Sequence, residues 1–290
     1  MSIRSTQGAA APTAAAIADQ AAGLRSLLKR RALRVLPVFG DHDPAAHGAC
    51  SAQLALALAR AGHKVVLLDA SGTALDALSL HADADLLEMI EGRRDFAAVA
   101  LRAAAGLRVI NARAGLPMLI AANAAGSEFF GGFLNLAEPA EILLLNLPAL
   151  ATPAGRLWLP MAGNACESLL VTMPGERALT AAYALIKQAA LPAAPDALAA
   201  PAFRILVNGA DGERAARAIC RQLSDTARRF LGVAVGYAGN LPCNTRGRGH
   251  VGPGAPHAEA ARAFARIAGE APGWRLAECM HDQSTATQTH

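Results

Sequence analysis

Short, almost wholly apolar segments alternate with helical patterns along most of this chain, and this alternation limits the folds that it can adopt. Strands that are apolar on both faces are typical of a parallel sheet covered by helices on both sides. The sequence therefore predicts an α/β fold, with one doubly wound, mostly parallel sheet. We expect strands at residues 35–39, 64–68, 107–110, 142–147, 169–173, 203–208 and 233–239, and helices at 17–31, 51–61, 85–91, 128–137, 177–191, 212–230 and 257–268.

Length and composition narrow the functional classes. A chain of 290 residues that is 53% hydrophobic can form one large domain with a sizeable core. Its net charge of +4 is too small to argue for direct binding of nucleic acid. No apolar run approaches the roughly 20 residues of a transmembrane helix. The five cysteines have no CxxC spacing, so reduced thiols of a cytoplasmic protein are expected, with no disulfide and no metal site: Cys50, Cys166, Cys220, Cys243 and Cys279.

We expect three parts along the chain. Residues 1–33 form an N-terminal tail that contains one helix, residues 34–250 form the α/β domain, and residues 251–290 form a short helix and a disordered C-terminal tail. The C-terminal helix carries Phe264 and Ile267 but few other large apolar groups. Stable membrane attachment through it is therefore not expected.

Four blocks of sequence resemble the MinD/ParA family of deviant P-loop ATPases: residues 53–71, 168–187, 203–208 and 235–242. The resemblance covers roughly residues 34–245 and implies a P-loop NTPase-like fold of the SIMIBI/MinD type. In that family ATP drives dimerisation and membrane attachment. An asparagine at the position that corresponds to Asn208 often faces the adenine of the bound nucleotide.

The segment DQAAGLR in the N-terminal helix resembles one branch of the family, the flagellar number regulators (FlhG/FleN). The resemblance implies that this helix binds the signal-recognition-type flagellar GTPase (FlhF-like) and stimulates its GTP hydrolysis. A glutamine can orient a water and an arginine can stabilise anionic charge. A generic amphipathic helix that packs on its own domain is the alternative. The expected partner-binding residues are Asp19, Gln20, Ala21, Gly23, Leu24 and Arg25.

In this chain, the segment at the position of the phosphate loop departs from the family's pattern. Phosphate loops direct backbone N–H groups and a lysine at phosphate oxygens, and glycines allow the close approach. The family pattern is KGGxGK[ST], and an ungapped count places residues 42–48 (HDPAAHG) there. His42 and His47 replace both lysines, and Gly48 replaces the residue that would bind magnesium. Asp41 and Asp43 add negative charge where phosphate would lie, and Pro44 removes an N–H donor.

Two further positions of the nucleotide site are altered. The family's first switch reads DxD, and here it is Asp69-Ala70-Ser71. The second switch begins with a magnesium-binding aspartate, and here Asn146 stands in its place. We therefore expect no catalytic residues, no ATP hydrolysis and no resident cofactor, with ATP and Mg²⁺ bound only if the altered loop still accepts them. The residues of this degenerate nucleotide site are Gly40, His42, His47, Gly48, Asp69, Asn146 and Asn208.

The two loop histidines and the neighbouring aspartates leave two interpretations open. They could form a metal site, or they could belong to a solvated loop that lost its function, which is the interpretation we favour. The expected function is a non-hydrolysing MinD-like regulator of flagellar biosynthesis that controls flagellar number or placement. The alternatives are an active ATPase that cycles between a membrane-bound dimer and a cytosolic monomer, or another MinD-like task such as cargo positioning.

The expected partners are the flagellar GTPase and, beyond it, flagellar switch or transcription-regulator proteins. The expected location is the cytoplasm, with peripheral association at the inner face of the membrane or at the cell pole.

Overall fold

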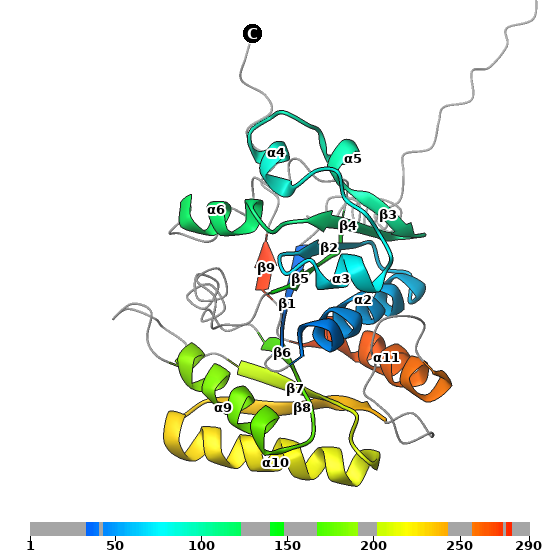
Figure 1. The fold of residues 1–290 in the computed structure, drawn as a ribbon. Helices are drawn as coiled ribbons and strands as arrows, with labels where there is room; N and C mark the ends of the chain where they lie inside the picture. The colour runs from blue at the N-terminus through cyan, green and yellow to red at the C-terminus, as the bar shows by residue number, and fades with distance from the viewer. Residues whose placement is uncertain are drawn as a thin grey trace, which may run out of the picture.

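The computed structural model describes residues 33–40, 43–122, 140–147, 167–190, 202–242, 257–274 and 277–279. Within these residues, nine strands form one sheet in the order β3-β4-β2-β5-β1-β6-β7-β8, and β9 pairs with β1 (Figure 1). The strands are β1 (Leu33–Gly40), β2 (Val65–Asp69), β3 (Leu101–Ala104), β4 (Leu107–Asn111), β5 (Ile142–Asn146), β6 (Glu167–Thr172), β7 (Ala202–Asn208), β8 (Ala234–Leu241) and β9 (Ala277–Cys279).

The sheet is mostly parallel, as the apolar strands predict. Among the described strands, only β3, which pairs with β4, and β9, which pairs with β1, run antiparallel to their neighbours. The parallel strands consequently end at one edge of the sheet, where ligand sites of open α/β sheets are usually found. The doubly wound, mostly parallel α/β fold is therefore confirmed.

Helices cover both faces of the sheet (Figure 1). Helices α9 and α10 pack on one face, and α2 and α11 pack on the other. The helices are α2 (Pro44–Arg60), α3 (Thr73–Ala77), α4 (Leu86–Ile90), α5 (Phe96–Val99), α6 (Gly115–Ala122), α9 (Glu176–Ala190), α10 (Gly212–Leu231) and α11 (Ala258–Glu270), which is followed by the 3-10 turn η1 (Ala271–Gly273).

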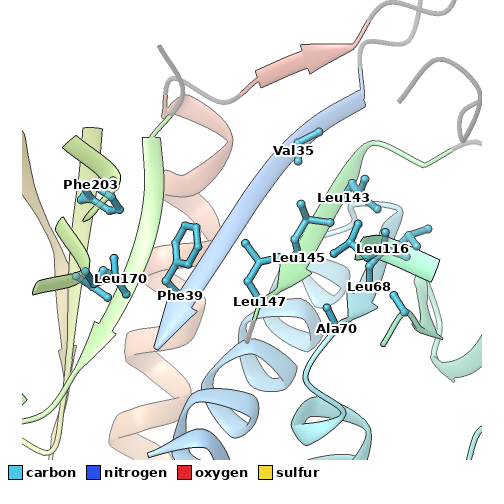
Figure 2. Close-up of a cluster of buried hydrophobic side chains, with 14 of the residues drawn as sticks. Val35, Phe39, Leu68, Ala70, Leu116, Leu143, Leu145, Leu147, Leu170 and Phe203 are labelled. Atoms are coloured by element: carbon cyan, nitrogen blue, oxygen red, sulfur yellow. The ribbon is translucent and has the colours of Figure 1, made fainter. Parts of the chain in front are cut away.

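Each face has its own apolar core. Figure 2 shows the core on the α9 and α10 face, where Val35 and Phe39 of β1 lie among leucines of the neighbouring strands. The rings of Phe39 and Phe203 pack edge to face, with 6.4 Å between their centroids. Burial of both faces explains why β2 and β5 are apolar at nearly every position.

One helix differs from its prediction in a way that affects the site. We expected a loop through residue 48 and a helix from residue 51, but α2 begins at Pro44. Asp43 caps this helix and proline occupies its first turn, where a missing N–H costs nothing. The segment expected to form a phosphate-binding loop is therefore helical from Pro44 onward.

The C-terminal segment contributes to the domain. Helix α11 matches its prediction, and its Phe264 and Ile267 are fully buried, within the core that α2 and β8 share. Strand β9 pairs with the start of β1. The expected tail after residue 250 thus includes two packed elements. No described helix is both long and apolar enough to span a bilayer.

Several predicted features lie outside the described residues. They are the N-terminal helix at 17–31, the helix at 128–137, and the tails at 1–14 and 281–290.

Candidate functional site

The described members of the predicted nucleotide site gather where the parallel strands end. Gly40, Asp69, Asn146 and Asn208 are the last residues of β1, β2, β5 and β7. His47 and Gly48 lie in the first turns of α2, which follows β1. Among the predicted residues, His42 and the six partner-binding residues between positions 19 and 25 lie outside the described part.

The N-terminus of α2 is capped by the chain itself. Oδ1 of Asp43 accepts hydrogen bonds from the backbone N–H groups of Ala45, at 2.9 Å, and Ala46, at 3.0 Å. A helix N-terminus attracts anions because its first N–H groups have no helical partner and its dipole is positive there. At this helix the anion is a carboxylate of the protein.

His47 cannot replace a phosphate-binding lysine in its observed position. Its side chain is buried, and Nε2 lies 3.2 Å from the carbonyl oxygen of Val38 in β1. Since a carbonyl oxygen only accepts, Nε2 carries the proton. Burial lowers the pKa of His47 to about 4, so the ring is neutral at pH 7. A Cβ atom at Gly40 would overlap this ring, which explains why glycine ends β1.

The carboxylate of Asp69 is fully buried and accepts hydrogen bonds from the protein. Oδ1 accepts from the N–H groups of Ser71, at 3.2 Å, and Gly72, at 2.8 Å. Oδ2 accepts from the N–H of Leu75 at 2.8 Å. Backbone donors therefore surround this charge at the turn between β2 and α3.

Asn146 links this turn to helices α2 and α3. Its Nδ2 lies 2.7 Å from Oδ1 of Asp69, 2.7 Å from Oγ of Ser71 and 3.2 Å from Oγ1 of Thr73. Its Oδ1 accepts a hydrogen bond from Oγ of Ser51, on α2, at 2.8 Å. The amide thus places donor hydrogens beside Asp69, where a metal site would need a second anionic ligand.

Gly48 has a packing role in this structure. A Cβ atom at this position would overlap Thr73 of α3, so glycine allows α2 and α3 to approach closely. The side chain of Thr73 is in turn bonded to Ser71, with 2.7 Å between the hydroxyl oxygens.

Asn208 lies apart from this group and is fully buried. Its Nδ2 lies 3.5 Å from Sγ of Cys50 on α2, which links β7 to that helix. Burial raises the pKa of the Cys50 thiol, which is therefore protonated at pH 7.

The sequence predicts the residues at the strand ends but not which side chains form hydrogen bonds with them. Ser51, Ser71, Thr73 and Cys50 are ordinary small residues, and only the fold brings them to Asn146 and Asn208. The signal for the cap was present as Asp43 followed by Pro44 before a helical run. The described residues include no group of three or more histidine, cysteine, aspartate or glutamate side chains suited to holding a metal ion.

Solved structures resemble this arrangement of strands and helices, although no family model matches the chain. The MinD cell division protein of Aquifex aeolicus superposes with a TM-score of 0.61 at 18% identity, over 83% of this chain and 97% of that one. A ParA family ATPase from Chlorobium tepidum gives a TM-score of 0.51 at 18% identity, over 85% and 95% of the two chains. At such identities the likeness establishes the fold.

One relative with a known name is similar to this chain in sequence as well. The antiactivator FleN of Pseudomonas aeruginosa is 29% identical over 254 residues, which cover 84% of this chain and 88% of FleN. The chain is thus similar in sequence to FleN over most of both proteins, and it shares the fold of the solved MinD and ParA family structures. A MinD of Pyrococcus horikoshii, with a TM-score of 0.53 at 17% identity over 82% and 96% of the two chains, was solved with Mg-ADP. In the chain described here, Asp43 engages the N-terminus of α2 and Asn146 engages the carboxylate of Asp69 at the carboxyl ends of the parallel strands.

Proposed function

We propose that this chain is a non-hydrolysing MinD-like regulator of flagellar biosynthesis that acts on flagellar number or placement. Its likeness to the antiactivator FleN supports a regulatory role. The observation that carries the non-hydrolysing part is the start of α2 at Pro44, with the carboxylate of Asp43 on its first N–H groups.

The geometry at α2 opposes phosphate binding. A phosphate could reach the N–H groups of Ala45 and Ala46 only by displacing the Asp43 carboxylate. If the carboxylate stayed close by, two like charges 4 Å apart would repel by about 4 kcal/mol near a protein surface. The neutral imidazole of His47 supplies no compensating positive charge.

The geometry at the strand ends opposes magnesium binding in a similar way. A cation beside Asp69 would meet the N–H groups of Asn146, which already donate to that carboxylate. Asn146 would have to break its bonds to Ser71 and Ser51 to present its oxygen instead. This arrangement supports the absence of a resident ATP–Mg²⁺ cofactor.

We place the activity toward the partner in the N-terminal helix. Its residues Asp19–Arg25 resemble those of regulators that stimulate an FlhF-like GTPase. Gln20 would orient the attacking water and Arg25 would stabilise phosphate charge in the partner's site. Flagellar switch or transcription-regulator proteins are further proposed partners.

We place the protein in the cytoplasm, with any association at the membrane or the cell pole mediated by these partners. The apolar face of α11, which could otherwise contact lipid, is buried in the domain.

Calorimetric titration with ATP and Mg²⁺ tests the non-hydrolysing part. We expect no saturable binding at millimolar nucleotide, and no ATP turnover above a buffer control. Saturable binding in the micromolar range would instead favour the cycling ATPase.

GTP turnover by the FlhF-like GTPase of the same organism tests the partner activity. We expect stimulation by the full-length chain and by a peptide of residues 14–31, and loss of stimulation with Gln20→Ala or deletion of residues 1–31. Gln7→Ala changes the same residue type outside the motif and serves as the matched control. Stimulation that survives the deletion would contradict the proposal.

A further inference from the structure

Strand β8 forms one end of the sheet in the described part of the chain, where β7 is its only partner. An edge strand presents unpaired N–H and C=O groups, and many proteins protect such an edge with charged residues or proline in the strand. The sequence of β8, AVGYAGNL, contains neither. Its first half, from Ala234 to Tyr237, is exposed or half-buried, whereas its second half is buried. A register shift against β7 follows Tyr237, so the accessible half is also the regular half.

Helix α10 lies alongside the accessible half of β8 (Figure 1). Oγ of Ser224, in the second half of the helix, donates a hydrogen bond to the carbonyl oxygen of Val235 at 3.0 Å. Near the start of the helix, the carboxylate of Glu213 accepts a hydrogen bond from the hydroxyl group of Tyr237 at 2.9 Å. The helix and the strand therefore run in opposite directions, and residues 213–224 flank the accessible half of β8.

A cavity of about 630 Å³ lies between this part of α10 and β8, and its walls are rich in positive charge. Among the described residues that line it, Glu213 is the only acidic one, and its carboxylate already pairs with Arg217 at 2.9 Å. Arg214 and Arg221 are exposed and form no ion pair with any described residue. The lining residues are Glu213, Arg214, Arg217, Cys220, Arg221 and Tyr237.

The charge of this cavity indicates what kind of molecule would occupy it. Like charges three or four residues apart destabilise a helix, so carboxylates beside Arg214, Arg217 and Arg221 would stabilise α10. A second copy of this chain that paired β8 with β8 would instead bring two sets of these arginines together. The arrangement therefore favours an acidic partner over self-association.

The spacing of the arginines suits an extended segment. Arg214 and Arg221 are separated by two helical turns, which is about 10 Å along the helix axis. In an extended segment, alternate side chains point to the same face and lie about 7 Å apart. Two acidic residues at alternate positions would therefore come within reach of both long arginine side chains.

We propose that the accessible half of β8, together with Arg214, Arg217 and Arg221, binds an extended acidic segment of a partner protein by strand addition. The backbone of the segment would pair with the edge of β8, and its carboxylates would contact the arginines. This docking surface lies in the folded domain. It goes beyond the proposed function, because it requires neither a nucleotide nor the N-terminal motif.

Fluorescence anisotropy of the full-length chain with a labelled peptide tests the proposal. The peptide alternates valine and glutamate over about eight residues, within the usual length of a strand. We expect saturable binding that weakens with salt, and a roughly tenfold loss of affinity with Arg214→Glu combined with Arg221→Glu. Arg60→Glu combined with Arg102→Glu makes the same change in charge at exposed positions of α2 and β3, and should bind the peptide as wild type does.

Two further peptides separate strand addition from attraction of charge alone. Proline at the centre of the peptide removes a backbone donor, and serine in place of glutamate removes the carboxylates; each change should weaken binding by about tenfold. Equal affinity for the proline peptide would overturn strand addition. Unchanged affinity of the folded double variant, or no saturable binding by wild type, would overturn the docking surface.

Other occupants of the edge give different results. Tighter binding of a DNA duplex than of the acidic peptide, lost in the double variant, would assign the arginines to nucleic acid and overturn the proposal. A wild-type dimer in light scattering that the acidic peptide dissociates would assign the edge to a second copy and overturn it as well. Circular dichroism melts verify that the variants fold.

Discussion

Asn146 shows how one residue type changes the chemistry of a strand end. Its donor hydrogens lie 2.7 Å from both Asp69 and Ser71, and its oxygen accepts from Ser51. An aspartate has the same shape but no donor at neutral pH. With asparagine at position 146, hydrogen bonds stabilise the carboxylate of Asp69. With aspartate there, a cation would be needed to offset the two negative charges.

We therefore expect Asn146→Asp to destabilise the protein by about 3 kcal/mol, because it places an unpaired buried charge beside the Asp69 carboxylate. Urea unfolding at pH 7.5 in the presence of a chelator measures the change. Asn111→Asp, at the half-buried end of the neighbouring strand β4, is the matched control and should cost much less. Equal losses in the two variants would contradict this account of Asn146.

His47 should make stability depend on pH. Its folded pKa of about 4 lies below the ordinary value of 6.5, so between these values the unfolded state binds a proton that the folded state does not. Stability is thus complete above pH 6.5 and should fall by up to about 3 kcal/mol as pH drops to 4.

Urea unfolding of wild type and His47→Gln between pH 4 and 7 tests this expectation, since the variant should show the smaller loss toward acid. His81→Gln alters an exposed histidine and should follow the wild-type profile. Indistinguishable profiles for all three proteins would show that His47 titrates normally.

For single residues, the sequence predicts which ones end the strands but not which side chains form hydrogen bonds with them. Asp69 and Asn146 follow apolar runs, so their place at the edge is predictable. Ser51 and Thr73 contact Asn146 only because α2 and α3 converge there. Partners far apart in sequence carry no local pattern, and therefore the hydrogen-bonded group itself could not be predicted.

Among the elements, α2 depends on the cap that Asp43 provides. Asp43→Ala should destabilise the protein by about 1 kcal/mol, because the N–H groups of Ala45 and Ala46 lose their acceptor. Asp43→Asn retains a capping oxygen and should cost only a few tenths of that amount. Thermal unfolding compares the two, and an alanine variant as stable as wild type would argue against the cap.

Helix α11 illustrates the difference between a packed helix and a membrane anchor. Phe264 lies in the core against α2, so Phe264→Ala should cost about 3–5 kcal/mol of unfolding free energy. Arg262→Ala, on the exposed side of the same helix, should change stability by less than about 0.5 kcal/mol. A negligible effect of Phe264→Ala would mean that α11 leaves the domain in solution.

Long periodic elements were predictable, and short ones were not. Helix α10 and the apolar strand β7 match their predictions within a residue or two. Strand β3 has four half-buried or exposed residues and shows no pattern, while the three-residue β9 follows the 3-10 turn without any apolar run. The start of α2 at Pro44 differs from the prediction, because the resemblance to the family placed a phosphate loop at residues 42–48. The local sequence Asp43-Pro44 is by itself typical of a helix start.

For the whole molecule, the proposed loss of nucleotide binding would remove the means by which ATP could change the oligomeric state of the protein. We expect the same mass by light scattering with and without ATP and Mg²⁺, because dimerisation of the MinD type requires the bound nucleotide. A nucleotide-dependent doubling of mass would contradict this expectation.

The pairing of β9 with β1 has a practical consequence. Leu33 and Cys279 are antiparallel partners, so their Cα atoms lie about 5 Å apart. A fluorescent domain fused shortly after β9 would therefore start beside Leu33, the first residue of β1. If the proposed partner binds residues 19–25, such a fusion would crowd it and imitate a loss of function in cells, whereas a single dye at position 279 would report on its binding.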